Sequence, residues 1–459
     1  MLSSEAAAPP RAEGPNLFGH PKGLYFLAFT ETWERFSYYG MTALVVLYMV
    51  NQLLLPGHVE HIVGFAQLRA GMESLSGPLS PQALASQLFG LYAGMVYFTP
   101  LLGGMLADRW IGQRNAVVIG ALSMFAGHIA MAFDESFLLA LLLLVLGSGL
   151  LKGNISAQVG ALYPRDDEAR RSRGFVIFST GINIGAVLGP LVCGALALYF
   201  GWHTGFGVAA VFMLAGLITY LTGYKYLPAR VARAVEQQHP LTRADWRVIG
   251  ALIAVIVISI LPSLAYTQHF NVMPVWIQQH VALDVGTWHI PVPWFQSIDS
   301  LTSTLSAAPL LWLWRRQAAR GRGPGDINKI AIGSWIGAGS NVMLAGAIYA
   351  ADGQLLSPIW PFLYCVGLGL TFIYYWPAML ALVSRAAPAR VNSTMVGLVF
   401  VNLFVTNLLV GWIGGRYERM SPMSFWSLHA LMGVAGGLVL MVFGRGLTRA
   451  LSAPSVNRP

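Results

Sequence analysis

The sequence predicts an all-α membrane protein, and its composition gives the first reason. Hydrophobic residues make up 56% of the 459 residues, charged residues make up only 10%, and the mean hydropathy is +0.60. These values lie far from those of soluble globular proteins. The second reason is that apolar runs long enough to cross a bilayer recur along the whole chain.

A window of about 19 residues locates about twelve such runs, which predicts twelve transmembrane helices. The first six cover residues 24–50, 87–107, 117–133, 138–160, 175–200 and 204–224. The second six cover residues 248–276, 294–314, 330–349, 360–382, 394–414 and 428–443. Glycine is abundant, at 50 residues, as expected where membrane helices approach closely and bend.

The connections between these spans alternate in charge. One set is rich in basic residues: Arg109, Arg114, Arg165, Arg170, Arg171, Arg173, Lys225, Arg230, Arg233, Arg243, Arg247, Arg315, Arg316, Arg320, Arg322, Lys329, Arg385 and Arg390. The opposite set carries little beyond Arg69, Arg416 and Arg419. Because basic loops stay in the cytoplasm, both termini are predicted to be cytoplasmic, which requires an even number of spans. The net charge of +9 therefore need not imply a nucleic-acid partner.

Two long connections suggest the domain organisation. Residues 52–86 are expected to form an external loop with a surface helix, and the polar linker 228–246 divides the spans six and six. The predicted parts are listed in order: a cytoplasmic tail 1–22, a first six-helix bundle 23–227, the cytoplasmic linker 228–246, a second six-helix bundle 247–446 and a cytoplasmic tail 447–459. No cleavable signal precedes the first span. Cys193 and Cys365 lie in apolar runs and are interpreted as packing residues.

The first span contains charged residues with apolar sequence on both sides. At helical spacing, Glu31, Glu34 and Arg35 fall near one face. A charge at mid-bilayer costs roughly 3 kcal/mol on insertion scales, so such residues normally pair or line a polar pathway. The alternative is a helix end whose charges reach the headgroups. The position of the cluster within the apolar run favours a buried charged site.

Two six-helix halves joined by a cytoplasmic linker resemble the plan of the major facilitator superfamily. The segment between spans two and three strengthens this resemblance, because Gly104, Asp108, Arg109, Gly112 and Arg114 stand at the spacing of that superfamily's cytoplasmic loop motif. In that motif the acid and the arginines hold neighbouring helix ends together. The resemblance also implies a substrate site near mid-membrane, between the two halves.

Further motifs resemble those of one family within that superfamily, the proton-dependent oligopeptide transporters. The first span reads Glu31-Thr-Trp-Glu-Arg-Phe-Ser-Tyr-Tyr-Gly40, and the second reads Thr99-Pro-Leu-Leu-Gly-Gly-Met-Leu-Ala-Asp108. The fourth contains Gly149-Leu-Leu-Lys-Gly-Asn-Ile-Ser-Ala157, with Gly153 where a proline is usual. The fifth contains Phe175-Val-Ile-Phe-Ser-Thr-Gly-Ile-Asn-Ile-Gly185.

The resemblance implies roles for the matching residues. Arg35 and Lys152 would bind the carboxylate of a peptide, Arg35 through its planar guanidinium and Lys152 as a point charge. Glu31 and Glu34 would neutralise these cations when no ligand is bound, so that protonation of a glutamate frees them for substrate. The alternative is a purely structural salt-bridge network of the same four residues. Tyr38, Tyr39, Tyr97 and Asn183 match pocket positions, although Tyr92 competes with Tyr97, and each could be only a packing or interhelical contact.

The second half departs from the family pattern. The family's Phe-Glu-Gln in span seven is replaced by Tyr266-Thr-Gln268, and no acid precedes Pro377 in span ten. Gln268 and Asp299 are the remaining candidates for substrate binding there. Asp299 either replaces part of the lost charge or is a helix-start residue near the external surface. His269 and His289 have no acid motif beside them and are assigned structural or loop roles.

The sequence therefore predicts a proton-coupled symporter that imports di- and tripeptides into a bacterial cytoplasm by alternating access. The alternatives are uptake of another carboxylate-bearing, peptide-like compound, and a ligand sensor that does not transport. No metal cluster, nucleophile elbow or phosphate loop is evident in the sequence, so an enzyme is not expected. We expect no cofactor or metal, the proton gradient as energy source, a small-molecule substrate and the lipid bilayer as partners, no nucleic acid, and a monomer in the inner membrane.

Overall fold

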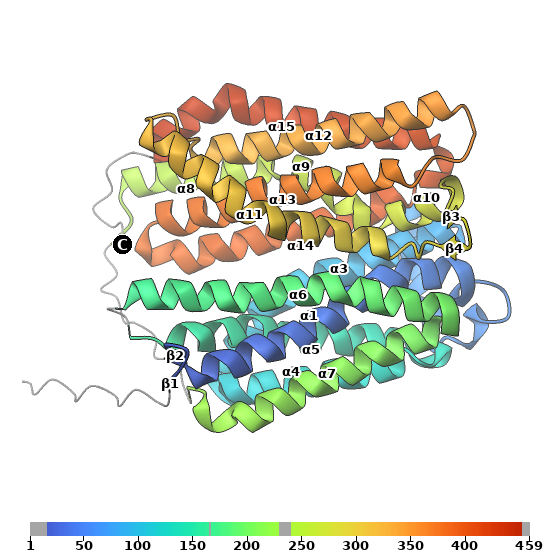
Figure 1. Ribbon diagram of the computed structural model, residues 1–459, viewed down its shortest axis with the longest axis horizontal. Coiled ribbons are helices and arrows are strands. Elements are labelled where there is room, and N and C mark those ends of the chain that lie inside the picture. The colour runs from blue at the N-terminus through green and yellow to red at the C-terminus, as the bar shows by residue number, and fades with distance from the viewer. Residues whose placement is uncertain (1–15, 165–166, 229–239, 452–459) are drawn as a thin grey trace, which may run out of the picture.

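The computed structural model describes residues 16–164, 167–228 and 240–451. The predicted linker lies mostly outside these ranges, as do most of both predicted tails and Arg165, Arg230 and Arg233. The exact boundaries predicted for the two bundles stay a prediction. Within the described ranges almost the whole chain is helical (Figure 1).

The first half contains six long helices: α1 (Lys22–Tyr48), α3 (Pro81–Leu106), α4 (Gln113–Ala130), α5 (Phe137–Ala161), α6 (Glu168–Phe200) and α7 (Trp202–Gly223). The shorter elements of this half are β1 (Asn16–Leu17), β2 (His20–Pro21), η1 (Met49–Leu53), η2 (Val59–His61), α2 (Phe65–Ser76), η3 (Ala107–Ile111), η4 (Asp134–Ser136) and η5 (Tyr224–Tyr226). Helix α2 lies in the connection between the first two spans and buries only Phe65. It is the surface helix expected in that loop.

The second half contains α8 (Arg243–Ile258), α9 (Ile260–Thr267), η6 (Gln268–Phe270), α10 (Val272–His280), α11 (Trp294–Ala319), α12 (Asp326–Ala351), α13 (Ile359–Ala386), η7 (Ala389–Val391), α14 (Asn392–Gly414), η8 (Tyr417–Arg419) and α15 (Pro422–Leu451). The strands β3 (Asp284–Val285) and β4 (Trp288–His289) form a short hairpin. The seventh span is therefore broken, because the chain leaves helical geometry at Asn271 (φ −106°, ψ −81°).

Nine helical segments in the described part of the chain are long and apolar enough to cross a membrane. Helices α1, α4 and α11 contain 27, 18 and 26 residues, and they bring the number of spans to the predicted twelve. Helix α1 differs from the nine because Glu31, Glu34 and Arg35 lie within it. The protein is thus a multi-pass membrane protein.

The two halves lie side by side, with α1 and α3–α7 in the lower part of Figure 1 and α8–α15 in the upper part. Helix α3 packs against α14, and α6 packs against α11. The basic connections gather at one end of the helices, at left in Figure 1 with β1 and the start of α8, which we call the arginine-rich end. The hairpin β3–β4 lies at the opposite end.

The two halves are held together at the opposite end. Asn51 Nδ2 donates a hydrogen bond to Gln278 Oε1 at 2.9 Å, and the Ser80 hydroxyl bonds to Glu418. Between them α3 and α14 touch backbone to backbone, because a Cβ atom on Gly90 would lie 2.5 Å from the Asn407 carbonyl oxygen. The structure is therefore closed at the end opposite the arginine-rich end.

The loop motif between α3 and α4 joins helix ends at the arginine-rich end. Gly104 lies in the last turn of α3, and Asp108 and Arg109 lie in η3. Gly112, at φ +76°, precedes α4. The Arg114 guanidinium bonds to the Leu227 carbonyl and lies 4.7 Å from the centre of the Tyr224 ring, so α4 is tied to the end of α7.

Substitution of Gly90 by valine is expected to open the closed end. A larger side chain cannot fit against α14, and overpacking of this kind costs about 1–3 kcal/mol, or a roughly 5- to 150-fold shift in a two-state equilibrium. The measurement is the rate at which a membrane-impermeant maleimide labels a cysteine placed at buried Ser86. The control is Gly207→Val, because a Cβ on Gly207 meets open space. Equal labelling rates in the two variants would contradict the packing argument.

Candidate functional site

A cavity of about 650 Å³ lies between the two halves. Its lining residues come from α1, α3, α5 and α6 of the first half and from α9, η6, α13 and α14 of the second. It reaches Leu380 in α13 and Ser393 in α14, which flank the connection that carries Arg385 and Arg390. Because the other end is closed, the cavity faces the arginine-rich end. This volume is within the usual range for small-molecule sites.

The charged segment of α1 is positioned by close packing against α6. A Cβ on Gly185 would overlap the Thr32 carbonyl and would lie 2.7 Å from the Cβ atom of Arg35. Gly181 and Gly189, one turn to either side, contact α1 in the same way. Small residues at this spacing let membrane helices approach closely. The fifth-span motif therefore acts first as a packing surface that fixes where Arg35 lies.

Arg35 is shared by the two glutamates. Its Nε atom lies 2.8 Å from Glu31 Oε1 and 2.7 Å from Glu34 Oε2, and all three residues are buried. Glu31 and Arg35 line the cavity, whereas Glu34 lies behind them and is fully buried. No protein hydrogen bond reaches the terminal guanidinium nitrogens of Arg35 from the described ranges. The fork of the guanidinium is thus available to a ligand carboxylate.

Lys152 lies beside Arg35 as a second cation. Its Nζ atom lies 4.2 Å from the centre of the Tyr38 ring and 5.5 Å from that of Tyr97. No carboxylate of the described residues lies within 4.0 Å of it. Lys152 therefore lies against aromatic faces, where cation–π attraction stabilises its charged form, and no carboxylate of the described residues is its partner.

The other residues predicted in the first half divide into two groups. Tyr38, Tyr39 and Tyr97 line the cavity, and the competing Tyr92 does not. Asn183 is half-buried in α6 and does not line the cavity, although its neighbour Ile182 does. The structure thus brings together the residues of the first, second and fourth spans but leaves Asn183 outside.

The second half lines the cavity with aromatic and small polar residues. The aromatic members are Tyr266, Phe270, Phe372, Tyr375, Trp376 and Phe400. No aspartate or glutamate of the described second half is among the lining residues. Gln268 points elsewhere: it is fully buried, and a Cβ on Gly414 would lie 3.0 Å from its Nε2 atom. Thr267 lines the cavity in its place.

Asp299 lies behind the cavity wall. It is buried in the second turn of α11, and its Oδ2 atom accepts a hydrogen bond from the Tyr266 hydroxyl at 2.8 Å. The same oxygen lies 3.3 Å from Nε2 of His269, which is also buried. His269 therefore has an acid beside it, contrary to the interpretation drawn from its neighbours in the sequence. No sequence signal links these two residues, because they lie on different helices.

Sequence reasoning also missed small polar residues of the cavity. Thr42, Ser156, Ser263, Thr371 and Asn407 line it, and each carries an uncharged hydroxyl or amide group within a membrane span. Such residues are common hydrogen-bonding groups between membrane helices, so their types alone did not single them out.

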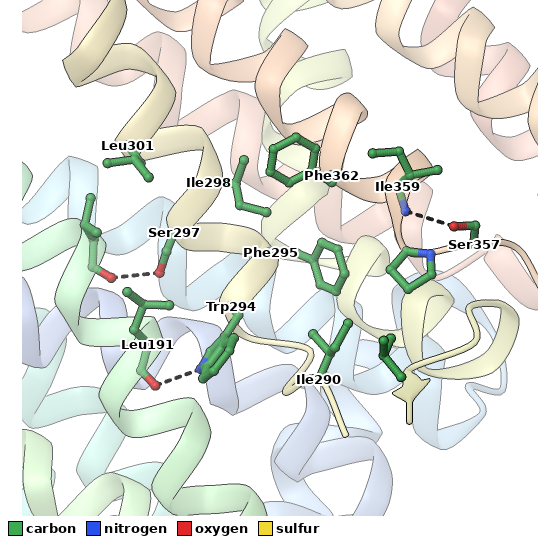
Figure 2. Close-up of a pocket in the computed structure, with 13 residues that line it drawn as sticks. Leu191, Ile290, Trp294, Phe295, Ser297, Ile298, Leu301, Ser357, Ile359 and Phe362 are labelled. Atoms are coloured by element: carbon green, nitrogen blue, oxygen red, sulfur yellow. Dashed lines mark hydrogen bonds between the residues drawn. The ribbon is translucent and has the colours of Figure 1, made fainter. Parts of the chain in front are cut away.

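A second cavity, of about 510 Å³, lies between α6, α11, α13 and the hairpin β3–β4 (Figure 2). Its lining is apolar apart from Ser297 and Ser357, and it contains no charged residue. A site of this kind offers nothing to bind a carboxylate. The cavity that contains Arg35 and Lys152 is therefore the candidate substrate site.

Comparisons with known proteins agree with this geometry. A sequence model of the Major Facilitator Superfamily matches residues 36–411. The "Peptide transporter YePEPT" of Yersinia enterocolitica is 29% identical over 94% of this chain and 95% of its own length. The "Di-/tripeptide transporter" of Lactococcus lactis subsp. cremoris is 25% identical over 95% and 97%. A crystal structure of peptide transporter POT in complex with sulfate has a TM-score of 0.82 and 27% identity, and the match covers 96% of this chain and 98% of that one.

The protein belongs to the major facilitator superfamily, whose twelve-helix fold of two six-helix bundles was predicted from its sequence. Within that superfamily it is a member of the proton-dependent oligopeptide transporter family, as the four span motifs indicated.

The contact of Lys152 with Tyr38 predicts a graded effect of substitutions at Tyr38. Tyr38→Phe keeps the aromatic face and is expected to leave the affinity for dialanine nearly unchanged. Tyr38→Leu removes it, and loss of a cation–π contact of about 0.5–2 kcal/mol corresponds to roughly 2- to 30-fold weaker binding. Isothermal titration calorimetry of the two purified variants measures both affinities. Equal losses in the two variants would assign the role to the hydroxyl instead.

Proposed function

We propose that the protein is a proton-coupled symporter that imports di- and tripeptides by alternating access. The observation that carries the proposal is the group of Glu31, Glu34, Arg35 and Lys152 beside a cavity between the two halves. The two similar proteins, a peptide transporter and a di-/tripeptide transporter, support peptides as the substrate class.

The charges of this group suggest how substrate and proton are coupled. Two carboxylates and two cations sum to zero, so the empty site is neutral. Binding of a peptide carboxylate adds one negative charge, which is costly in a poorly solvated site. Protonation of Glu31 or Glu34 restores neutrality. It also weakens the ion pair of that glutamate with Arg35. One proton is therefore expected to accompany each carboxylate at this site.

Each bound group has a proposed place. The substrate carboxylate bonds to the terminal nitrogens of Arg35 and lies near Lys152, with Tyr38, Tyr39 and Tyr97 around it. The rest of the peptide extends toward the aromatic residues of α9 and α13. Glu31 lines the cavity and takes the proton from solvent, whereas Glu34, behind it, holds Arg35 in position. Opening toward the arginine-rich end then releases peptide and proton together.

The remaining parts of the proposal follow the charge distribution. The basic connections favour a cytoplasmic location of the arginine-rich end and of both termini, in a bacterial inner membrane. The conformation described here is then closed to the outside and open to the inside. We propose that the protein acts as a monomer, driven by the proton gradient without a cofactor, and that it catalyses no chemical reaction.

Uptake of labelled dialanine into proteoliposomes tests the proposal. We expect uptake to need an inward proton gradient and Glu31→Gln to abolish gradient-driven uptake, because the substitution removes the carboxyl group that takes the proton from the cavity. Exchange of external for internal dialanine, which needs no net proton movement, is expected to persist. Glu73→Gln in the exposed helix α2 is the matched control and should behave as the unsubstituted protein. Binding without any flux would favour the ligand sensor.

The lining of the second half supports a wider substrate range as a second candidate. Because no carboxylate of the described second half lines the cavity, a free α-amine has no acid there to bind. We expect N-acetyl-dialanine to compete with dialanine within about tenfold, since a neutral amide loses no strong ion pair. Competition for uptake measures this ratio. Failure of the acetylated compound to compete would mean that Glu31, the one carboxylate among the described lining residues, receives the amine.

A further inference from the structure

We propose that His269 and Asp299 form a second proton-binding site, in the second half, and that its proton holds the protein closed at the end opposite the arginine-rich end. The inference deepens the proposed function and rests on it for its place in transport. The pair lies outside the group around Arg35, and it is separated from the cavity by Tyr266, which lines the cavity and bonds to Asp299.

The hydrogen bonds of His269 show where its protons must be. Its Nδ1 atom lies 2.7 Å from the carbonyl oxygen of Tyr266. A carbonyl oxygen only accepts, so Nδ1 carries a hydrogen and donates it. A neutral imidazole has one such hydrogen, and its Nε2 atom would then present a lone pair. The network thus assigns the tautomer of neutral His269.

That tautomer conflicts with what faces it. Nε2 lies 3.3 Å from Asp299 Oδ2, which already accepts the hydrogen of the Tyr266 hydroxyl. Two acceptors at this distance in a buried site repel each other. One additional proton, carried by Nε2 or by the carboxyl group, turns the repulsion into a charge-assisted or neutral hydrogen bond. The two buried groups therefore face each other at ion-pair distance, with no hydrogen bond from Nε2 among the described residues, and an additional proton would remove the repulsion between them.

The surroundings give the pair no other source of charge. The titratable groups that face Asp299 from the packed helices are tyrosines and a thiol, which are ordinarily neutral near pH 7: Tyr39, Tyr266, Tyr364 and Cys365. In the described part of the chain, His269 is the one basic residue within 4.0 Å of Asp299. Without the proton the pair carries a buried negative charge, and with it the pair is neutral. Burial of an uncompensated charge is costly, so loss of the proton strongly favours a rearrangement.

The pair also joins two segments, α11 and η6, that are linked by hydrogen bonds or packing to the first half. On the side of Asp299, the Ser297 hydroxyl donates to the Val187 carbonyl at 2.7 Å, and the Trp294 indole donates to the Leu191 carbonyl at 2.9 Å (Figure 2). Both bonds tie α11 to α6.

On the side of His269, the turn η6 leads into Asn271. The side-chain amide of Asn271 donates a hydrogen bond to the Val410 carbonyl of α14 at 3.3 Å. Helix α14 in turn packs against α3 of the first half. A proton between His269 and Asp299 therefore links both contacts at the closed end. Repulsion after its loss pushes η6 away from α11 and loosens that end.

Spin labels test this directly. Cysteines at Tyr199 and Leu355, which are both exposed at the closed end, report its opening as a distance measured between pH 5 and pH 8. We expect the closed population to fall as pH rises, since loss of the proton from the pair disfavours the closed form. Asp299→Asn should stay closed throughout, because the asparagine amide can donate to Nε2. His269→Gln leaves the carboxylate without its cation and should favour the open form throughout.

Two controls separate this pair from other groups. Asp284→Asn removes the exposed contact of His289 Nδ1 with Asp284 at 2.7 Å and should leave the titration unchanged. Glu34→Gln should also keep it, because the pair is intact. The proposal is overturned if Asp299→Asn titrates like the unsubstituted protein, or if Glu34→Gln abolishes the titration. The distances require neither substrate nor gradient, so absence of dialanine uptake with an intact titration would count against the proposed function alone.

Discussion

The ion pair that Arg35 shares with Glu31 and Glu34 is the interaction on which the site depends. A buried guanidinium has to be compensated, and here Nε donates a hydrogen bond to Glu31 and lies 2.7 Å from Glu34 Oε2, which compensates the charge without accepting a hydrogen bond from the described residues. This leaves the fork of the guanidinium for a ligand without leaving the charge unpaired. A symmetric, bidentate pair with one glutamate would have stabilised the empty site more and offered the ligand less.

The packing of the helices follows from this requirement. Arg35 has to lie between the halves, so α1 must be held at a fixed rotation, and the glycine surface of α6 does this by allowing backbone contact along one face. The same helix α6 contacts α11 across the interface. A movement of α11 against α6 is therefore felt by the helix that positions Arg35. Substrate site and closed end share one structural element.

The first half could be predicted in more detail than the second, and the reason is physical. In α1, the charged residues lie within about one turn of an unbroken helix. Their spacing in the sequence therefore gives their relative positions directly. In the seventh span, a continuous helix was assumed over residues 248–276, whereas the chain breaks at Ser259 and again at Asn271. Each break rotates the following residues. Gln268 lies beyond the first break, in the turn η6, and faces α14, whereas Thr267 lines the cavity.

Contacts between segments that are far apart in the sequence could not be predicted, for a different reason. The neighbourhood of Asp299 is created by α9, η6 and α13 together, and a single sequence gives no relative rotation for these elements. The sequence therefore left open whether Asp299 is buried or lies at the surface. Asn183 is a related case, since its motif placed it on the correct helix but could not say that Ile182, one residue away, reaches the cavity.

The two halves thus differ in what they contribute. The first supplies fixed charges that sum to zero around the ligand, and the second supplies aromatic walls with a His–Asp pair behind them. A site with all its charges on one side can change affinity without moving the other side. Transport, however, requires that the halves separate at one end when they close at the other. A titratable pair located where η6 and α11 grip the first half provides a force at that interface, which the group around Arg35, confined to one half, does not.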